Sequence, residues 1–244
     1  MKKADRNSVT RVAIGIQARS GSTRLPSKIT RPLCGKPMLE WVIDACISSA
    51  AYLSRPNLSR NIKVSVALLI PKDDPVKSLF YNKVQIIEGS ENDVLSRYIS
   101  CGDFFDADYV VRVTGDCALI TSGIITKCIN SATMEGLDYV SNVDERLRLS
   151  FDGLDCEVIS RRLLSYVGEH ATDSKDREHV TTFIRSGSLP NEFTMGDVIP
   201  YCDLSSMKLS IDNEDDFVRV EKHLSRVLEA IETSKKLGHK VYRF

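Results

Sequence analysis

Short aliphatic and β-branched runs alternate along the chain with stretches in which apolar residues recur every three or four positions. The short runs predict buried strands, and the periodic stretches predict amphipathic helices. The expected strands are residues 9–18, 62–70, 84–87, 109–114, 139–143 and 155–160, and the expected helices are 38–49, 94–105, 124–134 and 217–231. Strands that alternate with helices indicate an α/β fold in which a mostly parallel sheet is covered by helices on both faces.

Two stretches interrupt this pattern. Residues 54–61 are rich in Pro, Asn and Ser, and residues 172–177 form a charged run. Both are expected to be connections within one domain, because no repeat or long linker separates two parts of the chain. We therefore predict a flexible tail over residues 1–10 and a single domain over 11–244.

The composition narrows the class of protein. Lys plus Arg and Asp plus Glu both number 33, so nothing favours a nucleic-acid partner or a polybasic membrane anchor. No stretch reaches the roughly 20 apolar residues that cross a bilayer, and the N-terminus lacks the apolar centre of a secretory signal. The 7 cysteines never form a C-x-x-C pair and are expected to be free thiols. These features predict a cytoplasmic protein.

The connection after the first expected strand carries the strongest chemical signal. The run IQARSGSTRLPSK, residues 16–28, places Arg19, Arg24 and Lys28 around Gly21 and Ser22. Ligands of open α/β sheets bind at such strand ends, and a polyphosphate requires cations and close backbone N–H groups. The spacing matches neither a Walker loop nor a dinucleotide fingerprint. The run is interpreted as a phosphate cradle of another kind, and solvated loop charges are the alternative.

Two aspartates are candidates for a metal site. Asp116 follows the expected strand 109–114, and Asp212 follows a short apolar run with an acidic cluster beyond it. Mg²⁺ usually takes one or two carboxylates together with phosphate oxygens, which two strand-end aspartates could provide. Asp116 could equally be a turn residue, and Asp212 could cap the last helix.

Beyond these separate signals, residues 16–28 and the following L-x-G-K-P-M-L-x-W run at 33–41 resemble the cytidylyltransferases that activate acidic sugars. These are the CMP-Kdo and CMP-sialic acid synthetases and, more closely, the spore-coat polysaccharide branch. Five further segments resemble that branch in the same order, namely 88–98, 110–120, 151–160, 176–181 and 209–217. Ala118, Asn213 and Phe151 depart from residues common in the family, but none of them replaces a charged catalytic position.

The resemblance implies the three-layer α/β/α sandwich of nucleotide-diphospho-sugar transferases and a homodimer. It also implies Mg²⁺-dependent transfer of CMP from CTP to an acidic, ulosonic-acid-type sugar, with release of pyrophosphate, for surface polysaccharide synthesis. Nucleotide contacts are implied for Gln17, Ala18, Arg19, Gly21, Ser22, Arg24, Lys28 and Asp116. Among these, Arg19, Lys28 and Asp116 are implied to be catalytic. The metal would be held by Asp116 and Asp212.

The base or ribose of the nucleotide is expected near Gly89 and Asp93. This assignment rests on the resemblance of residues 88–98 to the family. Asp93 could instead cap the helix that begins at Val94.

The acceptor sugar is expected near two further pairs of residues. Asp155 and Glu157 share one face of a short strand, so they could bind sugar hydroxyls or pair with Arg161 or Arg177. Arg177 and His179 are candidates for the carboxylate of an acidic acceptor, because a guanidinium fork matches that shape.

Three other functions remain open. The chain could use another nucleoside triphosphate. It could also be a non-catalytic nucleotide-binding subunit of a polysaccharide assembly, because a protein can retain its fold after losing catalytic activity. A glycosyltransferase would need a metal-binding D-x-D motif, and none follows an expected strand.

Overall fold

The computed structural model describes residues 9–22, 24–56, 58, 60–143, 152–200, 206 and 208–241. Most of the tail predicted over residues 1–10 lies outside this part, as does Phe151, and Thr10 is already the first residue of a strand. The strands are β1 (Thr10–Gln17), β2 (Pro32–Leu33), β3 (Lys36–Pro37), β4 (Ile62–Pro71), β5 (Gln85–Gly89), β6 (Tyr109–Thr114), β7 (Tyr139–Ser141), β8 (Cys156–Ser160) and β9 (Met195–Asp197).

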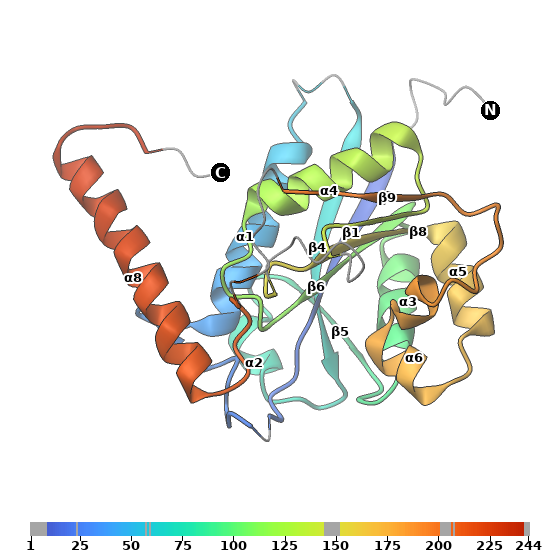
Figure 1. The fold of residues 1–244 in the computed structure, drawn as a ribbon, viewed down its shortest axis with the longest axis horizontal. Coiled ribbons are helices and arrows are strands. Elements are labelled where there is room, and N and C mark those ends of the chain that lie inside the picture. The colour runs from blue at the N-terminus through green and yellow to red at the C-terminus, as the bar shows by residue number, and fades with distance from the viewer. Residues whose placement is uncertain are drawn as a thin grey trace.

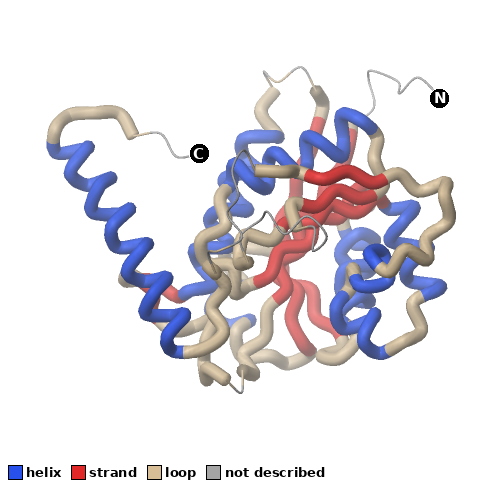
Figure 2. Tube along the Cα trace, viewed as in Figure 1, coloured by secondary structure: helices blue, strands red, loops and turns tan. Residues whose placement is uncertain are grey.

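A seven-stranded sheet in the order β5-β4-β1-β6-β8-β7-β9 forms the centre of the molecule (Figures 1 and 2). β1 pairs in parallel with β4 and β6, β4 with β5, and β7 with β9. β8 runs antiparallel to both β6 and β7. The prediction of a mostly parallel sheet is therefore confirmed, and β8 is the strand that reverses direction.

Helices cover both faces of the sheet. The helices are α1 (Met38–Leu53), α2 (Lys77–Phe80), α3 (Val94–Phe104), α4 (Ser122–Glu135), α5 (Arg161–His170), α6 (Ser174–His179), α7 (Thr182–Arg185) and α8 (Glu214–Lys236), of which α8 extends away from the sheet (Figure 1). α1 and α4 contact each other on one face, and α3 contacts α5 and α6 on the other (Figure 1). This confirms the predicted three-layer α/β/α sandwich.

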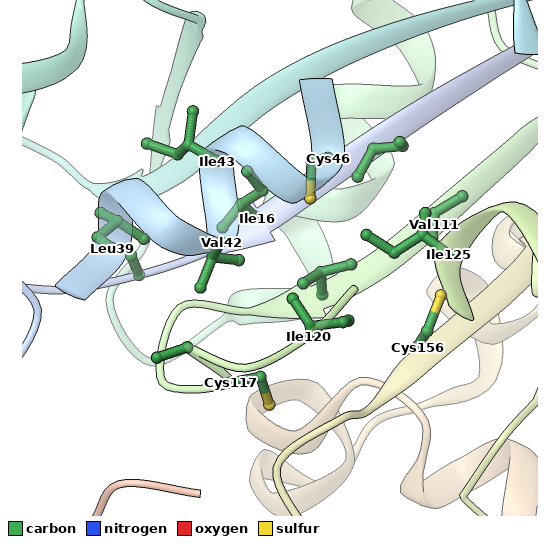
Figure 3. Close-up of a cluster of buried hydrophobic side chains, with 14 of the residues drawn as sticks. Ile16, Leu39, Val42, Ile43, Cys46, Val111, Cys117, Ile120, Ile125 and Cys156 are labelled. Carbon is green, nitrogen blue, oxygen red and sulfur yellow. The ribbon is translucent and has the colours of Figure 1, made fainter. Parts of the chain in front are cut away.

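The core lies in two apolar layers, one on each face of the sheet. Figure 3 shows the layer beneath α1, where Val42 and Cys46 of the helix face Ile16 of β1 and Val111 of β6. All four side chains are fully buried. This packing and the pairing of the two strands hold the carboxyl ends of β1 and β6 side by side. The loop after β1 and the loop after β6 begin there.

Polar caps define where the helices begin. The Asp93 carboxylate accepts the backbone N–H of Ser96 at the start of α3, and the Asn213 side chain accepts that of Asp216 at the start of α8. Each cap satisfies a backbone donor that has no partner within the helix. Since Asn213 caps α8, the side chain of Asp212 is not used as the cap.

The connection predicted over residues 172–177 contains helical structure from Ser174 onward. The structure forms the short helix α6 there, with Asp173 accepting the backbone N–H of Lys175 at 2.7 Å. None of the residues of α6 is buried, so the helix has no apolar stripe that a sequence pattern could detect. In the part of the chain that is described, no helix is long and apolar enough to cross a membrane.

Candidate functional site

A cavity of about 310 Å³ opens at the carboxyl ends of β1 and β6. Its walls come from the loop after β1, the start of α3, the loop after β6, the end of α6 and the segment before α8. The residues from the sequence predictions that line it are Gln17, Ala18, Arg19, Gly21, Ser22, Arg24, Lys28, Asp116, His179 and Asp212. Segments distant in the sequence thus meet at one end of the sheet.

Lys28 lies between the two aspartates predicted to bind metal. Its Nζ donates a 3.0 Å hydrogen bond to Asp116 Oδ2 and lies 3.9 Å from Asp212 Oδ1. The same ammonium donates to the carbonyl oxygen of Ile211 at 2.7 Å, and the Lys28 side chain is 13% exposed. Burial opposes ionisation of Asp116, but the charge and hydrogen bond of Lys28 outweigh it and lower the pKa of this carboxyl.

The other two cations of the loop also pair with carboxylates. Arg24 Nη2 lies 3.0 Å from Asp212 Oδ1, and Arg19 Nη1 lies 3.3 Å from Glu91 Oε1. The Arg24 and Arg19 side chains are 71% and 53% exposed. Ion pairs this exposed contribute less than about 1 kcal/mol, so both guanidinium groups can exchange their present partners for a phosphate.

The loop that carries these cations is held by hydrogen bonds to the turn after β4 and within the loop itself. The Asp74 carboxylate accepts the backbone N–H of Ser20 at 2.8 Å and also bonds its hydroxyl. The Ser22 hydroxyl accepts the backbone N–H of Leu25 at 3.3 Å. Apart from its two chain neighbours, no described residue has an atom within 4 Å of the position a Cβ on Gly21 would take, so a ligand can approach the backbone there.

Asp116 and Asp212 fit a metal that arrives with a nucleotide. Among the described residues no three His, Cys, Asp or Glu side chains gather as a complete metal site. The two aspartates instead share Lys28 as an ion-pair partner, and Asp212 also pairs with Arg24 and Lys208. Two carboxylates are the usual protein share of a Mg²⁺ site whose other ligands are phosphate oxygens and water.

Two of the predicted nucleotide or acceptor residues hold helices together. Asp93 caps α3, as the alternative interpretation stated, and its other oxygen lies 2.7 Å from Arg177 Nη2. Arg177 also donates to the carbonyl oxygens of Gly168 and Ala171 at the end of α5. Neither residue lines the cavity, whereas His179, two residues beyond Arg177, does.

Glu157 lies in the interior and does not itself line the cavity, although its partner Arg112 does. Its side chain is 2% exposed, Arg112 Nη1 donates to it at 2.5 Å, and the Tyr139 hydroxyl donates to its other oxygen. Glu157 therefore forms an ion pair, as one of the two interpretations stated. Its partner is Arg112 and neither Arg161 nor Arg177. Arg161, which was one candidate, pairs with Asp103.

Asp155 is set apart from Glu157 by its environment. Its Oδ1 is buried without a hydrogen-bond partner in the described part of the protein. Burial, reinforced by the negative charge of Glu157, raises the pKa of Asp155 to about 7. Asp155 and Gly89 do not line the cavity.

Sequence reasoning missed two arginines in the cavity wall, Arg97 and Arg112. Arg97 occupies the buried stripe of α3 beside Val94 and Tyr98, and burial lowers the pKa of its guanidinium. A charged residue on the apolar stripe of a helix is the signal that could have identified it.

A mostly parallel sheet whose strand ends carry a cation-rich loop opposite two aspartates is an α/β protein with a ligand site suited to phosphate groups. The family model described as cytidylyltransferase matches residues 13–190, which is most of the chain. The protein belongs to the cytidylyltransferase family, which confirms the resemblance.

One relative is similar in sequence over most of both chains, and two solved structures share the fold. A spore coat polysaccharide biosynthesis protein of Bacillus subtilis is 26% identical over 84% of this chain and 83% of its own length. A solved cytidylyltransferase of Leptospira borgpetersenii superposes with a TM-score of 0.75 and 24% identity, over 96% of this chain and 100% of that one. A CMP:2-keto-3-deoxy-manno-octonic acid synthetase, solved with CTP, gives a TM-score of 0.63 at 14% identity, over 89% and 99% of the two chains.

Proposed function

We propose that this cytidylyltransferase transfers CMP from CTP to a hydroxyl of an acidic, ulosonic-acid-type sugar, releases pyrophosphate, and requires Mg²⁺. The observation that carries the proposal is the position of Lys28 between Asp116 and Asp212, in a cavity that also receives Arg19 and Arg24. Membership in the family supports CTP as the substrate.

The residues of the cavity suit a displacement at phosphorus. The acceptor oxygen bonds to the α-phosphorus, the bond from that phosphorus to the bridging α–β oxygen breaks, and pyrophosphate leaves. The hydroxyl proton passes to solvent. Such a step needs charge neutralisation and in-line placement more than a covalent contribution from the protein.

Within that step, Arg19, Arg24 and Lys28 would neutralise the phosphates, and the backbone at Gly21 would approach them closely. Asp116 and Asp212 would hold the metal, which supplies further charge neutralisation and orients the triphosphate. When the nucleotide enters, the exposed pairs of Arg19 and Arg24 would open in favour of phosphate oxygens.

On the acceptor side, His179 is the predicted residue that lines the cavity, together with the adjacent Glu178. Arg177 would act through its position, because its contacts with Asp93 and α5 hold α6 and therefore His179 in place. The resemblance to acidic-sugar cytidylyltransferases also supports a cytoplasmic homodimer that serves surface polysaccharide synthesis.

Pyrophosphate release tests the proposal. The protein is incubated with each of the four ribonucleoside triphosphates, with and without Mg²⁺, against a panel of ulosonic acids and neutral sugars. We expect release with CTP, Mg²⁺ and an acidic sugar together, and its loss in Asp116→Asn. The control is Asp44→Asn, whose carboxylate pairs with Lys36 away from the cavity and is 49% exposed.

Two results would contradict the proposal. Triphosphate binding without turnover on any acceptor would identify a non-catalytic nucleotide-binding subunit. Turnover with another nucleotide in preference to CTP would support nucleotidyl transfer but reject CTP as the substrate.

A further inference from the structure

Arg97 is a buried cation that the phosphate chemistry above does not use. The residue is 2% exposed and lines the cavity, and no ion pair within 4.0 Å is recorded for it in the described part of the chain. Its Nη1 donates to the carbonyl oxygen of Leu69 at 2.9 Å, and its buried Nε has no acceptor among the same residues. Burying a guanidinium without a carboxylate is costly, and an apolar side chain would stabilise this helix position better.

The fold makes room for this side chain. A Cβ added to Gly89, the last residue of β5, would lie 2.7 Å from Arg97 Cγ. Glycine at this position therefore allows the arginine stem to pass the strand end and reach the cavity. Gly89, which does not itself line the cavity, acts on the site through Arg97.

Gln17 supplies the complementary group. It is the last residue of β1 and pairs in register with Leu69, the residue whose carbonyl binds Arg97. Gln17 also lines the cavity, and its Oε1 is buried without a hydrogen-bond partner among the described residues. A wall of the cavity thus offers an acceptor and a donor that no described protein group satisfies, whereas buried polar groups are nearly always paired.

This wall differs from the phosphate end of the cavity. Lys28 and Arg24 meet Asp116 and Asp212, while Arg97 and Gln17 meet the backbone of β4 at Leu69. A group that fills the wall beside β4 must offer a donor to Gln17 and an acceptor to Arg97. The edge of a nucleotide base provides such a pattern, and a phosphate, which only accepts, does not.

We propose that Gln17 and Arg97 bind the pairing edge of cytosine and that Arg97 is the residue that rejects uracil. The proposal rests on the proposed function, in which CTP enters this cavity. The cytosine amino group donates to Gln17 Oε1, and the ring N3 and O2 accept from the Arg97 guanidinium.

Arg97, and not Gln17, discriminates cytosine from uracil. The Gln17 carboxamide can turn over and offer its N–H groups to the O4 of uracil. A guanidinium has no acceptor, so the N3–H of uracil would face another donor and remain unpaired. A buried donor left without an acceptor is penalised strongly, which selects against the wrong base.

Isothermal titration separates this role from phosphate binding and from structural support. CTP, UTP and inorganic tripolyphosphate are titrated with Mg²⁺ into the wild type and Arg97→Met, which keeps a long apolar stem. The control Arg11→Met removes an exposed arginine that pairs with Asp106 at the opposite end of β1. Thermal unfolding of each protein shows whether it is folded.

We expect Arg97→Met to weaken CTP binding by about 10- to 100-fold, which is the discrimination a good bidentate base contact supplies. UTP affinity should not fall, tripolyphosphate affinity should be unchanged, and the melting temperature should not drop. Gly89→Ala should reduce the preference for CTP in the same direction by displacing Arg97. Arg11→Met should bind all three ligands like the wild type.

Three outcomes would overturn the inference while leaving the proposed function intact. Arg97→Met could keep the wild-type preference for CTP over UTP. Its affinity for tripolyphosphate could fall as much as its affinity for CTP. Its affinity for CTP could also fall together with a lower melting temperature, which would indicate a structural role. Failure of the wild type to bind any nucleoside triphosphate would instead reject the proposed function itself.

Discussion

Replacement of Lys28 by methionine tests the arrangement at the phosphate end of the cavity. Lys28→Met keeps the length of the side chain and removes the charge that Asp116 and Asp212 share. Asp116 then loses its cation, Asp212 keeps only Arg24 and Lys208, and the carbonyl oxygen of Ile211 loses its donor. The pKa of Asp116 should rise, because Lys28 is the group that lowers it against the effect of burial.

The structure sets the size of the effect. A fully buried pair that loses one partner costs about 3–5 kcal/mol of unfolding free energy, but the Asp116 and Asp212 side chains are 34% and 22% exposed. Solvent screens them, so we expect a loss of about 1–2 kcal/mol at pH 7. The catalytic effect should be larger, about 10²- to 10³-fold in kcat/KM for CTP, as for other groups that stabilise transition-state charge.

The assay combines urea unfolding with initial rates of pyrophosphate release. Lys83→Met is the matched control, because Lys83 pairs with Glu40 outside the cavity. Lowering the pH below the ordinary range of aspartate should shrink the stability difference, because the pairing of Asp116 with Lys28 stabilises the fold only while Asp116 is ionised. A rate for Lys28→Met within a few-fold of the wild type would show that the Lys28 ammonium does not stabilise the transition state.

Three further predictions concern the buried groups. Glu157→Gln should lower the unfolding free energy in urea by about 3 kcal/mol, because it leaves the charge of Arg112 buried; a loss below about 1 kcal/mol would contradict this. Asp155 has a folded pKa of about 7, above its ordinary value, so the folded state binds more protons and stability falls as the pH rises from about 4 to 7. Asp155→Asn should flatten that fall in urea titrations at pH 5 and 8, and an unchanged slope would count against it. Gly153→Ala should lower both the melting temperature and the rate. The φ angle of Gly153 is 104°, and the added Cβ would lie 2.1 Å from the backbone nitrogen of Ser210, two residues before the aspartate proposed to hold the metal. Wild-type values for both would disprove this prediction.

The sequence predicted the central elements well because their signals are local. The expected strand 109–114 coincides with β6, and the expected helix 94–105 with α3, where buried residues recur at helical spacing. The strand β9 was not predicted, because it contains three residues of which none is buried. Short elements with no apolar face take their conformation from tertiary contacts.

The site was predictable where it follows from strand ends and unpredictable where it depends on pairing between strands. The loop after β1 and Asp116 after β6 meet because adjacent parallel strands end at the same edge of the sheet. Alternation placed Asp155 and Glu157 on one face, but only the antiparallel register of β8 on β6 sets Glu157 opposite Arg112. Long-range register of this kind cannot be derived from local periodicity.

Direct observation of the product gives the most decisive test of the central claim. The protein is mixed with CTP, Mg²⁺ and an ulosonic acid, and the reaction is followed by phosphorus NMR. We expect the three CTP signals to be replaced by a phosphodiester signal from a CMP-sugar and by pyrophosphate in equal amounts, and we expect Asp116→Asn to leave CTP intact. Persistence of CTP with every acidic acceptor, or release of phosphate without a CMP-sugar, would contradict this claim.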